Sequence, residues 1–237
     1  MGLKKLRILV VDDEKDIREL IQDQFEIFGF DVDVAEGGDD AWAMFEKDPY
    51  DVVITDVRMP KGSGPELLEK IKKYDVHSPK VYFISGYYDF PKEDIFHVGA
   101  DGLFPKPFSA TILRESIRKA SMPNLQRWGQ KKFHNVQHKF KLVTGPSQVV
   151  SVGRGGLFIQ CKENIPKEDE EVEFEIGFDN SLGLIKGEGR VLWSRSQDSE
   201  GCLSGVGVEI QWLSKECINE FVSFVAESSI LPYIPKT

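Results

Sequence analysis

The sequence contains few cysteines and no long apolar run. Its three cysteines (Cys161, Cys202 and Cys217) are odd in number and form no C-x-x-C pair. This pattern argues against a disulfide framework or a zinc site and favours a reducing cytoplasm. No apolar run approaches the ~18 residues that a membrane-spanning helix needs, and the N-terminus shows no signal-peptide cleavage pattern. We therefore expect a cytoplasmic protein without membrane insertion.

Basic residues are outnumbered by acidic ones. Lysine and arginine number 30 against 39 aspartate and glutamate residues, which gives a net charge of −9. This charge disfavours nonspecific nucleic-acid binding, and no helix-turn-helix pattern or basic recognition helix is visible. We therefore expect no DNA partner.

The length of 237 residues, with 41% hydrophobic residues, suffices for two domains that each bury a core.

The first half alternates short apolar runs with segments of helical period. The runs 6–11, 52–54 and 81–84 are almost wholly apolar, as strands covered on both faces must be. Amphipathic segments follow them, the last with Ser109 as its expected N-cap. The order predicts an α/β doubly wound, five-stranded parallel sheet over residues 1–121.

The second half has a different period. Residues 171–178 and 205–212 alternate apolar and polar side chains, and glycines separate several such runs. This pattern predicts an antiparallel β-barrel over residues 127–237, with a C-terminal helix near residues 215–227. Residues 122–126 are the expected linker, since Pro123 should end the preceding helix.

Polar residues follow four strands of the predicted parallel sheet. Asp12 and Asp13 follow the first strand, Asp56 the third, Ser85 the fourth and Lys106 the fifth. Strand ends of a parallel sheet share one edge, so these side chains should converge. Three crowded carboxylates repel one another, and Mg²⁺ is the hard oxygen-seeking cation that would relieve the repulsion. Taken singly, each residue has a simpler explanation, such as Asp13 capping a helix.

The stretches Val10–Glu14, Ile54–Pro60, Ile84–Gly86 and Lys106–Phe108 together resemble the response-regulator receiver domain (flavodoxin-like). The resemblance implies that Asp56 accepts a phosphoryl group from a sensor histidine kinase. It also implies that Asp12, Asp13, Asp56 and the backbone carbonyl of Arg58 hold Mg²⁺, while Ser85 and Lys106 contact the phosphoryl group. Phe104 occupies the position of the family's aromatic switch, although it could be a permanent core residue.

The resemblance implies a signalling protein rather than an enzyme, with autophosphatase activity at most. A haloacid-dehalogenase-type phosphatase would need a second aspartate where Arg58 stands. A constitutive scaffold with a vestigial receiver is another alternative, against which the intact acidic set argues. The expected partners are the kinase, an unidentified downstream protein and a phosphorylation-dependent homodimer.

The turn Ser151–Ile159, the two runs Gly189–Trp193 and Gly205–Glu209, and the terminal helix resemble the PilZ domain. PilZ domains typically bind cyclic di-GMP through an Arg-x-x-x-Arg pair and an Asp/Asn-x-Ser-x-x-Gly turn. The corresponding candidate nucleotide-binding residues are Arg127, Trp128, Lys131, Lys132, Ser151, Gly153, Arg154 and Gly156.

Both motifs depart from the PilZ pattern. Depending on register, the pair reads either Arg127…Lys131 or Trp128…Lys132, and lysine cannot form the planar bidentate fork of arginine. In the turn, Gly153 replaces the serine, and Ser151 cannot present a carboxylate to a guanine edge. Trp128 and Arg154 could compensate by stacking and phosphate contact. Two outputs therefore stay open: a PilZ-like domain that acts mainly as a protein-interaction module, which we prefer, and one that still binds cyclic di-GMP.

Overall fold

The computed structural model describes residues 5–86, 91–129, 136, 138–143, 149–178, 182–198 and 201–237. The chain forms two compact units. The N-terminal unit comprises Met1–Pro91 and Val98–Ser121, and the C-terminal unit comprises Lys92–His97 and Met122–Thr237. A short helix in the middle of the first half thus belongs to the C-terminal unit.

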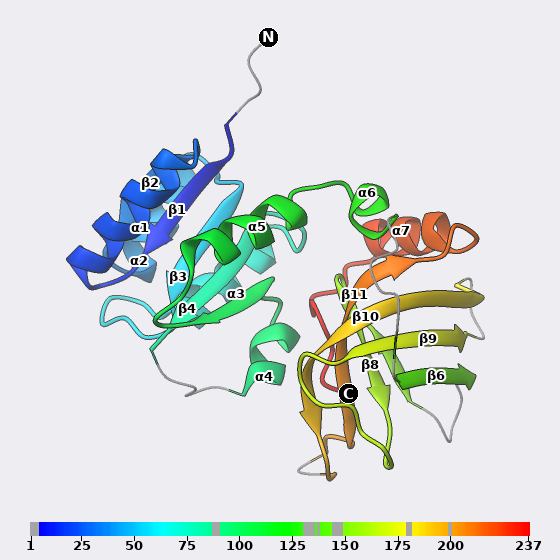
Figure 1. Cartoon of the computed structure of the whole chain (residues 1–237). Helices are drawn as coiled ribbons and strands as arrows, with labels where there is room; N and C mark the ends of the chain where they lie inside the picture. The colour runs from blue at the N-terminus through cyan, green and yellow to red at the C-terminus, as the bar shows by residue number, and fades with distance from the viewer. Residues whose placement is uncertain are drawn as a thin grey trace. The chain divides into compact units, whose positions relative to one another are not determined.

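The N-terminal unit is built on a five-stranded parallel sheet, drawn from blue to green in Figure 1. Its strands are β1 (Arg7–Val11), β2 (Asp31–Ala35), β3 (Val52–Asp56), β4 (Lys80–Ser85) and β5 (Gly102–Pro105). They are ordered β2-β1-β3-β4-β5, and each neighbouring pair is parallel. The predicted fold of the first half is therefore confirmed.

Amphipathic helices connect these strands. They are α1 (Lys15–Ile27), α2 (Gly38–Lys47), α3 (Gly64–Tyr74) and α5 (Ala110–Ala120). The Ser109 side chain accepts a hydrogen bond from the Ile112 amide and caps α5, as the sequence predicts. Ile21 and Phe25 of α1 pack with Leu113 of α5 against the central strands. The strands β1, β3 and β4 are largely apolar and buried because helices cover both faces of the sheet, whereas β2, at one edge, alternates exposed aspartates with apolar residues.

The C-terminal unit contains a curled, mixed sheet of six strands. These are β6 (His138–Val143), β7 (Val150–Val152), β8 (Gly156–Gln160), β9 (Glu171–Gly177), β10 (Leu184–Arg195) and β11 (Gly205–Leu213). Their order is β6-β9-β10-β11-β8-β7. The pair β6–β9 is parallel and the other pairs are antiparallel. The expectation of a wholly antiparallel barrel is therefore wrong for one pair. In the chain, β7 and β8 come between β6 and β9, and this long connection lets β6 and β9 pair in parallel.

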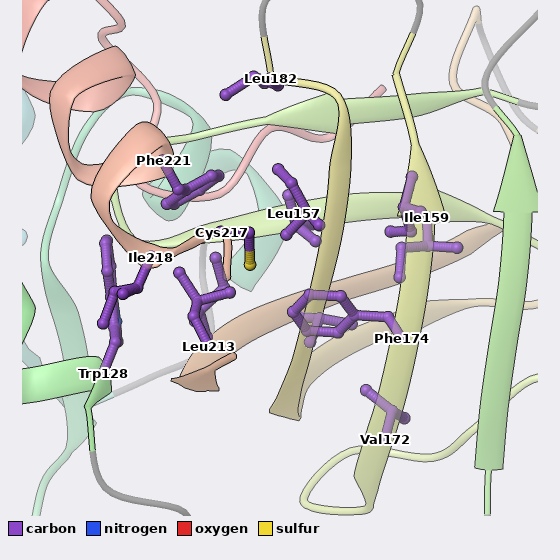
Figure 2. Packing of buried hydrophobic residues seen from close by; sticks show 14 of the residues in the cluster. Trp128, Leu157, Ile159, Val172, Phe174, Leu182, Leu213, Cys217, Ile218 and Phe221 are labelled. Atoms are coloured by element: carbon purple, nitrogen blue, oxygen red, sulfur yellow. The ribbon is translucent and has the colours of Figure 1, made fainter. Parts of the chain in front are cut away.

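The described residues of this unit also form the helices α4 (Lys92–His97), α6 (Asn124–Trp128) and α7 (Ile218–Glu227). The expected linker at residues 122–126 thus runs into α6. Figure 2 shows the core between the helices and the sheet, with Trp128 and Phe221 on the helical side and Phe174 on β9. Alternate β9 residues, Val172, Phe174 and Ile176, are buried, as the alternating pattern predicts.

No helix within the described ranges is long and apolar enough to cross a membrane.

Candidate functional site

The carboxyl ends of β1 and β3 bring three aspartates together. Asp12 and Asp13 follow β1, and Asp56 is the last residue of β3, which pairs directly with β1. One carboxylate oxygen from each of the three lies within 4.8 Å of the others. Asp12 is fully buried, Asp56 is half-buried and Asp13 is exposed, so the cluster opens toward solvent on one side. Helix α1 has Glu14 at its N-cap with no side-chain capping bond, so Asp13 does not serve as the cap.

Lys106, which follows β5, places its ammonium group among these carboxylates. Its Nζ donates a hydrogen bond to Asp12 Oδ2 at 2.8 Å and lies 3.7 Å from Asp56 Oδ1. The backbone N–H of Lys106 also donates to the Ser85 carbonyl at 2.7 Å, which fixes the two strand ends together. Residues that span about ninety positions of sequence, from Asp12 to Lys106, thus meet at one rim, as the order of the strands predicts.

The burial and charges of this rim shift two pKa values. Burial raises the pKa of Asp56, and the charge of Asp12 adds to the rise, while the Lys106 charge opposes it only in part. Burial pulls the pKa of Lys106 downward, but its hydrogen bond and charge interaction with Asp12 outweigh that effect and raise the pKa. The anionic rim therefore has unbalanced negative charge that a cation would neutralise.

Three clustered carboxylate oxygens with an open side fit a hard divalent cation such as Mg²⁺, which takes few protein ligands and keeps several waters. The backbone carbonyl of Arg58, two residues beyond Asp56, is the further ligand that we expect. Ser85 ends β4 beside Asp56, since Ile84 pairs with Asp56 in the sheet register. Ser85 and Lys106 thus both lie close to Asp56 at the strand ends.

Phe104 lies on β5, half-buried, two residues before Lys106. Its ring packs beside that of buried Tyr82, with 6.1 Å between the ring centroids. This placement suits either a switching side chain or a permanent core residue.

Sequence reasoning missed Arg18, which positions the loop that carries Asp12 and Asp13. The Arg18 side chain is buried, and its Nη1 donates to the carbonyl oxygens of Asp12 at 2.6 Å and Asp13 at 3.0 Å. Its Nη2 lies 3.6 Å from Glu36. In the sequence, Arg18 is simply an arginine in the first turn of a predicted helix. An arginine that is exposed to solvent would have the same sequence context, so its role could not be predicted.

The candidate nucleotide-binding residues of the C-terminal unit are mostly occupied by contacts within that unit. Arg127 is buried and lies 3.2 Å from Glu209, and it also donates to the Tyr233 hydroxyl. Trp128 is fully buried, and its ring meets Phe221 edge-on with 5.4 Å between the centroids. Trp128 is therefore a core residue, and its ring is not available to stack on a base.

The glycine-rich turn shows a similar occupation. Arg154 is buried, and its Nε donates to the Leu231 carbonyl at 3.2 Å. Ser151 is a half-buried residue of β7, and the Gly153 N–H donates to the Gly156 carbonyl at 2.8 Å. Lys131 and Lys132 lie outside the described residues. Glu209, the last residue of the PilZ-like run Gly205–Glu209, and Tyr233, which belongs to no recognised motif, hold Arg127, and this role was not anticipated for either residue.

Comparison with known families identifies the N-terminal unit. Residues 8–118 match the response regulator receiver domain. The alkaline phosphatase synthesis transcriptional regulatory protein PhoP of Bacillus subtilis is 34% identical over 187 residues, which cover 78% of this chain and 74% of PhoP. The transcriptional regulatory protein DltR of Streptococcus agalactiae is 32% identical over 133 residues. That match covers 56% of this chain and 59% of DltR, so the chain spans little more than half of DltR.

Two solved structures are similar to the first half. A response regulator receiver domain protein from Clostridium thermocellum is 35% identical, with a TM-score of 0.46 over 48% of this chain and 93% of that one. The response regulator TrrA of Thermotoga maritima, solved with Mg²⁺ and BeF, is 36% identical, with a TM-score of 0.45 over 49% of this chain and 99% of that one.

The expectation of no DNA partner is wrong by this comparison. PhoP, DltR and the RprY protein of Bacteroides fragilis, which is 30% identical over 68% of this chain, are all named transcriptional regulatory proteins. The net charge was a poor guide because it describes the whole chain, whereas DNA binding depends on where on the surface the positive charges lie.

Proposed function

Since this chain belongs to the response-regulator family, we propose that Asp56 is its phosphoacceptor and that Asp12, Asp13, Asp56 and the Arg58 carbonyl hold the Mg²⁺ that the reaction needs. The observation that carries the proposal is the clustering of three aspartate oxygens within 4.8 Å beside the Lys106 ammonium. Two-component signalling then supplies the input, with a sensor kinase as the general partner of response regulators.

The transfer is a displacement at phosphorus. A carboxylate oxygen of Asp56 attacks the phosphorus of the donor, and the bond from phosphorus to the donor breaks as the new O–P bond forms. The donor departs with the electron pair, as an imidazole from phosphohistidine or as acetate from acetyl phosphate. The product is an aspartyl phosphate, and no oxidant or further reactant is needed.

The residues around Asp56 make this attack possible by charge. An anionic carboxylate approaches an anionic phosphoryl group only where positive charge offsets both. Lys106, 3.7 Å from Asp56, supplies one such charge, and Mg²⁺ supplies the rest when bound. The Ser85 hydroxyl, at the end of the neighbouring strand, would donate a hydrogen bond to a phosphoryl oxygen.

The C-terminal unit is the proposed output, as a PilZ-like module that acts mainly through protein contacts. Support comes from Arg127 and Arg154, whose guanidinium groups are buried and bonded within the unit, and from Trp128, whose ring is in the core. A guanidinium already paired with a carboxylate has little left to offer a phosphate. The alternative is retained cyclic di-GMP binding. Calorimetric titration of the full chain decides, since saturable heat that disappears in Arg127→Ala would favour the nucleotide.

The names of the relatives bring gene regulation into the proposal. PhoP and DltR are transcriptional regulatory proteins, so control of transcription is a candidate output for this chain as well. Fluorescence anisotropy of labelled DNA fragments, with the full chain before and after treatment with Mg²⁺ and beryllofluoride, tests it. Binding that depends on the treatment would support a direct role at DNA, and no binding in either state would favour an output through protein contacts.

Intact-mass spectrometry tests the phosphoacceptor. The full chain incubated with acetyl phosphate and Mg²⁺ should gain the mass of one phosphoryl group. Asp56→Asn should gain none, while Asp16→Asn, an exposed position near the same rim, should behave as the unchanged protein. Phosphorylation of Asp56→Asn to the same extent would overturn the proposal.

A further inference from the structure

The last residues of the chain return to the glycine-rich turn of the C-terminal unit. Leu231–Lys236, here named the C-terminal strap, follow α7 and place three consecutive carbonyl groups on the turn. The Arg154 N–H donates to the Pro232 carbonyl at 2.9 Å, the Gly155 N–H to the Tyr233 carbonyl at 2.9 Å, and Arg154 Nε to the Leu231 carbonyl at 3.2 Å. The glycine-rich turn thus binds the backbone carbonyl groups of the strap, as peptide-binding sites bind the backbone of an extended peptide.

Tyr233 is the anchor of the strap. Its side chain is buried, and its hydroxyl donates to Glu209 Oε1 at 2.8 Å while it accepts a hydrogen bond from Arg127. The Arg154 guanidinium lies 5.9 Å from the centre of the same ring. The next residue, Ile234, is fully buried in an apolar cluster. Without the strap, buried Arg127 and half-buried Glu209 would lose the Tyr233 hydroxyl that bonds both, and the apolar cluster around Ile234 would open.

The glycines of the turn leave room for the strap because they carry no side chains. A side chain at Gly155 would overlap the Tyr233 ring, and one at Gly153 would meet the Tyr233 carbonyl and lie 2.8 Å from Pro235 Cδ. A side chain at Gly156 would overlap the Val208 carbonyl of β11 and would also lie 2.8 Å from Ile234 Cγ1 of the strap. The motif that resembles a nucleotide-binding turn therefore clears space for the chain's own C-terminal residues.

Helix α4, which belongs to the same compact unit, lies on the other side of the strap. The Tyr233 N–H donates to the Phe96 carbonyl at 2.9 Å, and the two rings are 6.1 Å apart. Lys236 Nζ bonds Asp94 at 2.7 Å, and the Lys236 N–H donates to His97 Nδ1 at 3.4 Å. The strap thus contacts α4 with backbone, ring and charge at once.

We propose that the C-terminal strap is an intramolecular ligand that joins α4 to the glycine-rich turn, so that seating of α4 and closure of the turn are one event. In the chain, α4 lies between β4, which ends at Ser85, and β5, which Lys106 follows. Release of the strap would therefore free α4. The proposal rests on the contacts of the strap alone and does not depend on phosphorylation of Asp56.

Hydrogen exchange of the full chain, measured by mass spectrometry without any phosphoryl donor, tests this coupling. Tyr233→Ala should raise exchange at least ~10-fold both in peptides that contain Arg154 and Gly155 and in peptides of α4. The matched control is Leu231→Ala, in the same strap: its side chain is 41% exposed, and the substitution keeps the backbone carbonyl that bonds Arg154, so protection should not change. If α4 keeps its protection while the turn loses it, the two contacts are independent and the proposal is wrong.

Milder variants cover the case in which Tyr233→Ala unfolds the unit, which peptides of β9 would reveal. Tyr233→Phe removes only the hydroxyl on the turn side, and Lys236→Gln removes only the charge on the α4 side. Coupling requires that each variant loosens both the turn and α4. A loosening confined to the side that was altered, in both variants, would overturn the proposal.

Discussion

Replacement of Lys106 by glutamine should destabilise the N-terminal unit, and Mg²⁺ should remove most of that loss. The ammonium lies 2.8 Å from Asp12 Oδ2 and 3.7 Å from Asp56 Oδ1, and Asp12 is fully buried. Glutamine leaves three clustered carboxylates without a positive charge on the β5 side. Bound Mg²⁺ would neutralise the same carboxylates, so it should substitute for the missing charge.

The expected magnitude follows from burial. Breaking a fully buried ion pair costs ~3–5 kcal/mol, whereas an exposed pair contributes about 0–1 kcal/mol. The Lys106 side chain is 18% exposed and Asp12 is fully buried. The loss of stability should therefore lie between the values for a buried and an exposed ion pair. We expect about 2 kcal/mol without Mg²⁺, equivalent to a ~30-fold rise in the opening equilibrium. With saturating Mg²⁺ the loss should fall below ~1 kcal/mol, since a ligand that binds only the folded state stabilises it.

Hydrogen exchange of peptides from β1 and β3 measures this loss within the full chain. Lys15→Gln is the matched control, because Lys15 forms an exposed pair with Glu19 at 3.5 Å and should cost no more than ~0.5 kcal/mol. An equal loss in Lys106→Gln with and without Mg²⁺ would show that the carboxylates and Lys106 do not form one electrostatic unit.

Three further changes test other parts of the structure. Arg18→Ala should weaken Mg²⁺ binding ~10–100-fold, as loss of a residue that orients metal ligands does, and a calorimetric titration would show it. Trp128→Ala should lower the free energy of unfolding of the C-terminal unit by ~3–5 kcal/mol through the cavity it leaves, measured as exchange in β9 peptides. The pKa of His97 is lowered, first by burial and then by the Lys236 charge, with Asp94 opposing. Since this folded-state pKa lies below the unfolded one, the strap should be fully seated at neutral pH. It should loosen as the pH falls below about 6.5, measured as exchange corrected for the intrinsic rate at each pH.

The parallel sheet and its acidic rim could be predicted because both follow from local patterns. Apolar runs between amphipathic segments leave few alternatives to a parallel sheet, and its topology forces Asp12, Asp56 and Lys106 to one edge. No knowledge of side-chain packing was needed for this step. The role of Arg18 could not be predicted because it depends on hydrogen bonds to the carbonyls of Asp12 and Asp13, and no sequence spacing indicates such bonds.

The C-terminal unit was harder because its chemistry depends on packing. Alternation locates strands such as β9 but does not say which strands are neighbours, so the parallel β6–β9 pair was missed. Trp128 looks the same in sequence whether it faces solvent or the core. Arg127 has a basic neighbourhood in the sequence, yet in the fold it meets Glu209 and Tyr233, which follow it at distances no motif describes.

We propose that Asp56 is the residue that carries a transferred phosphate. Borohydride reduces an aspartyl phosphate to homoserine, so treatment after incubation with acetyl phosphate and Mg²⁺ marks the modified position permanently. Peptide mass spectrometry should find homoserine at position 56, and only when Mg²⁺ was present. Homoserine at another aspartate, or at position 56 to the same extent without Mg²⁺, would show that Asp56 is not a Mg²⁺-dependent phosphoacceptor.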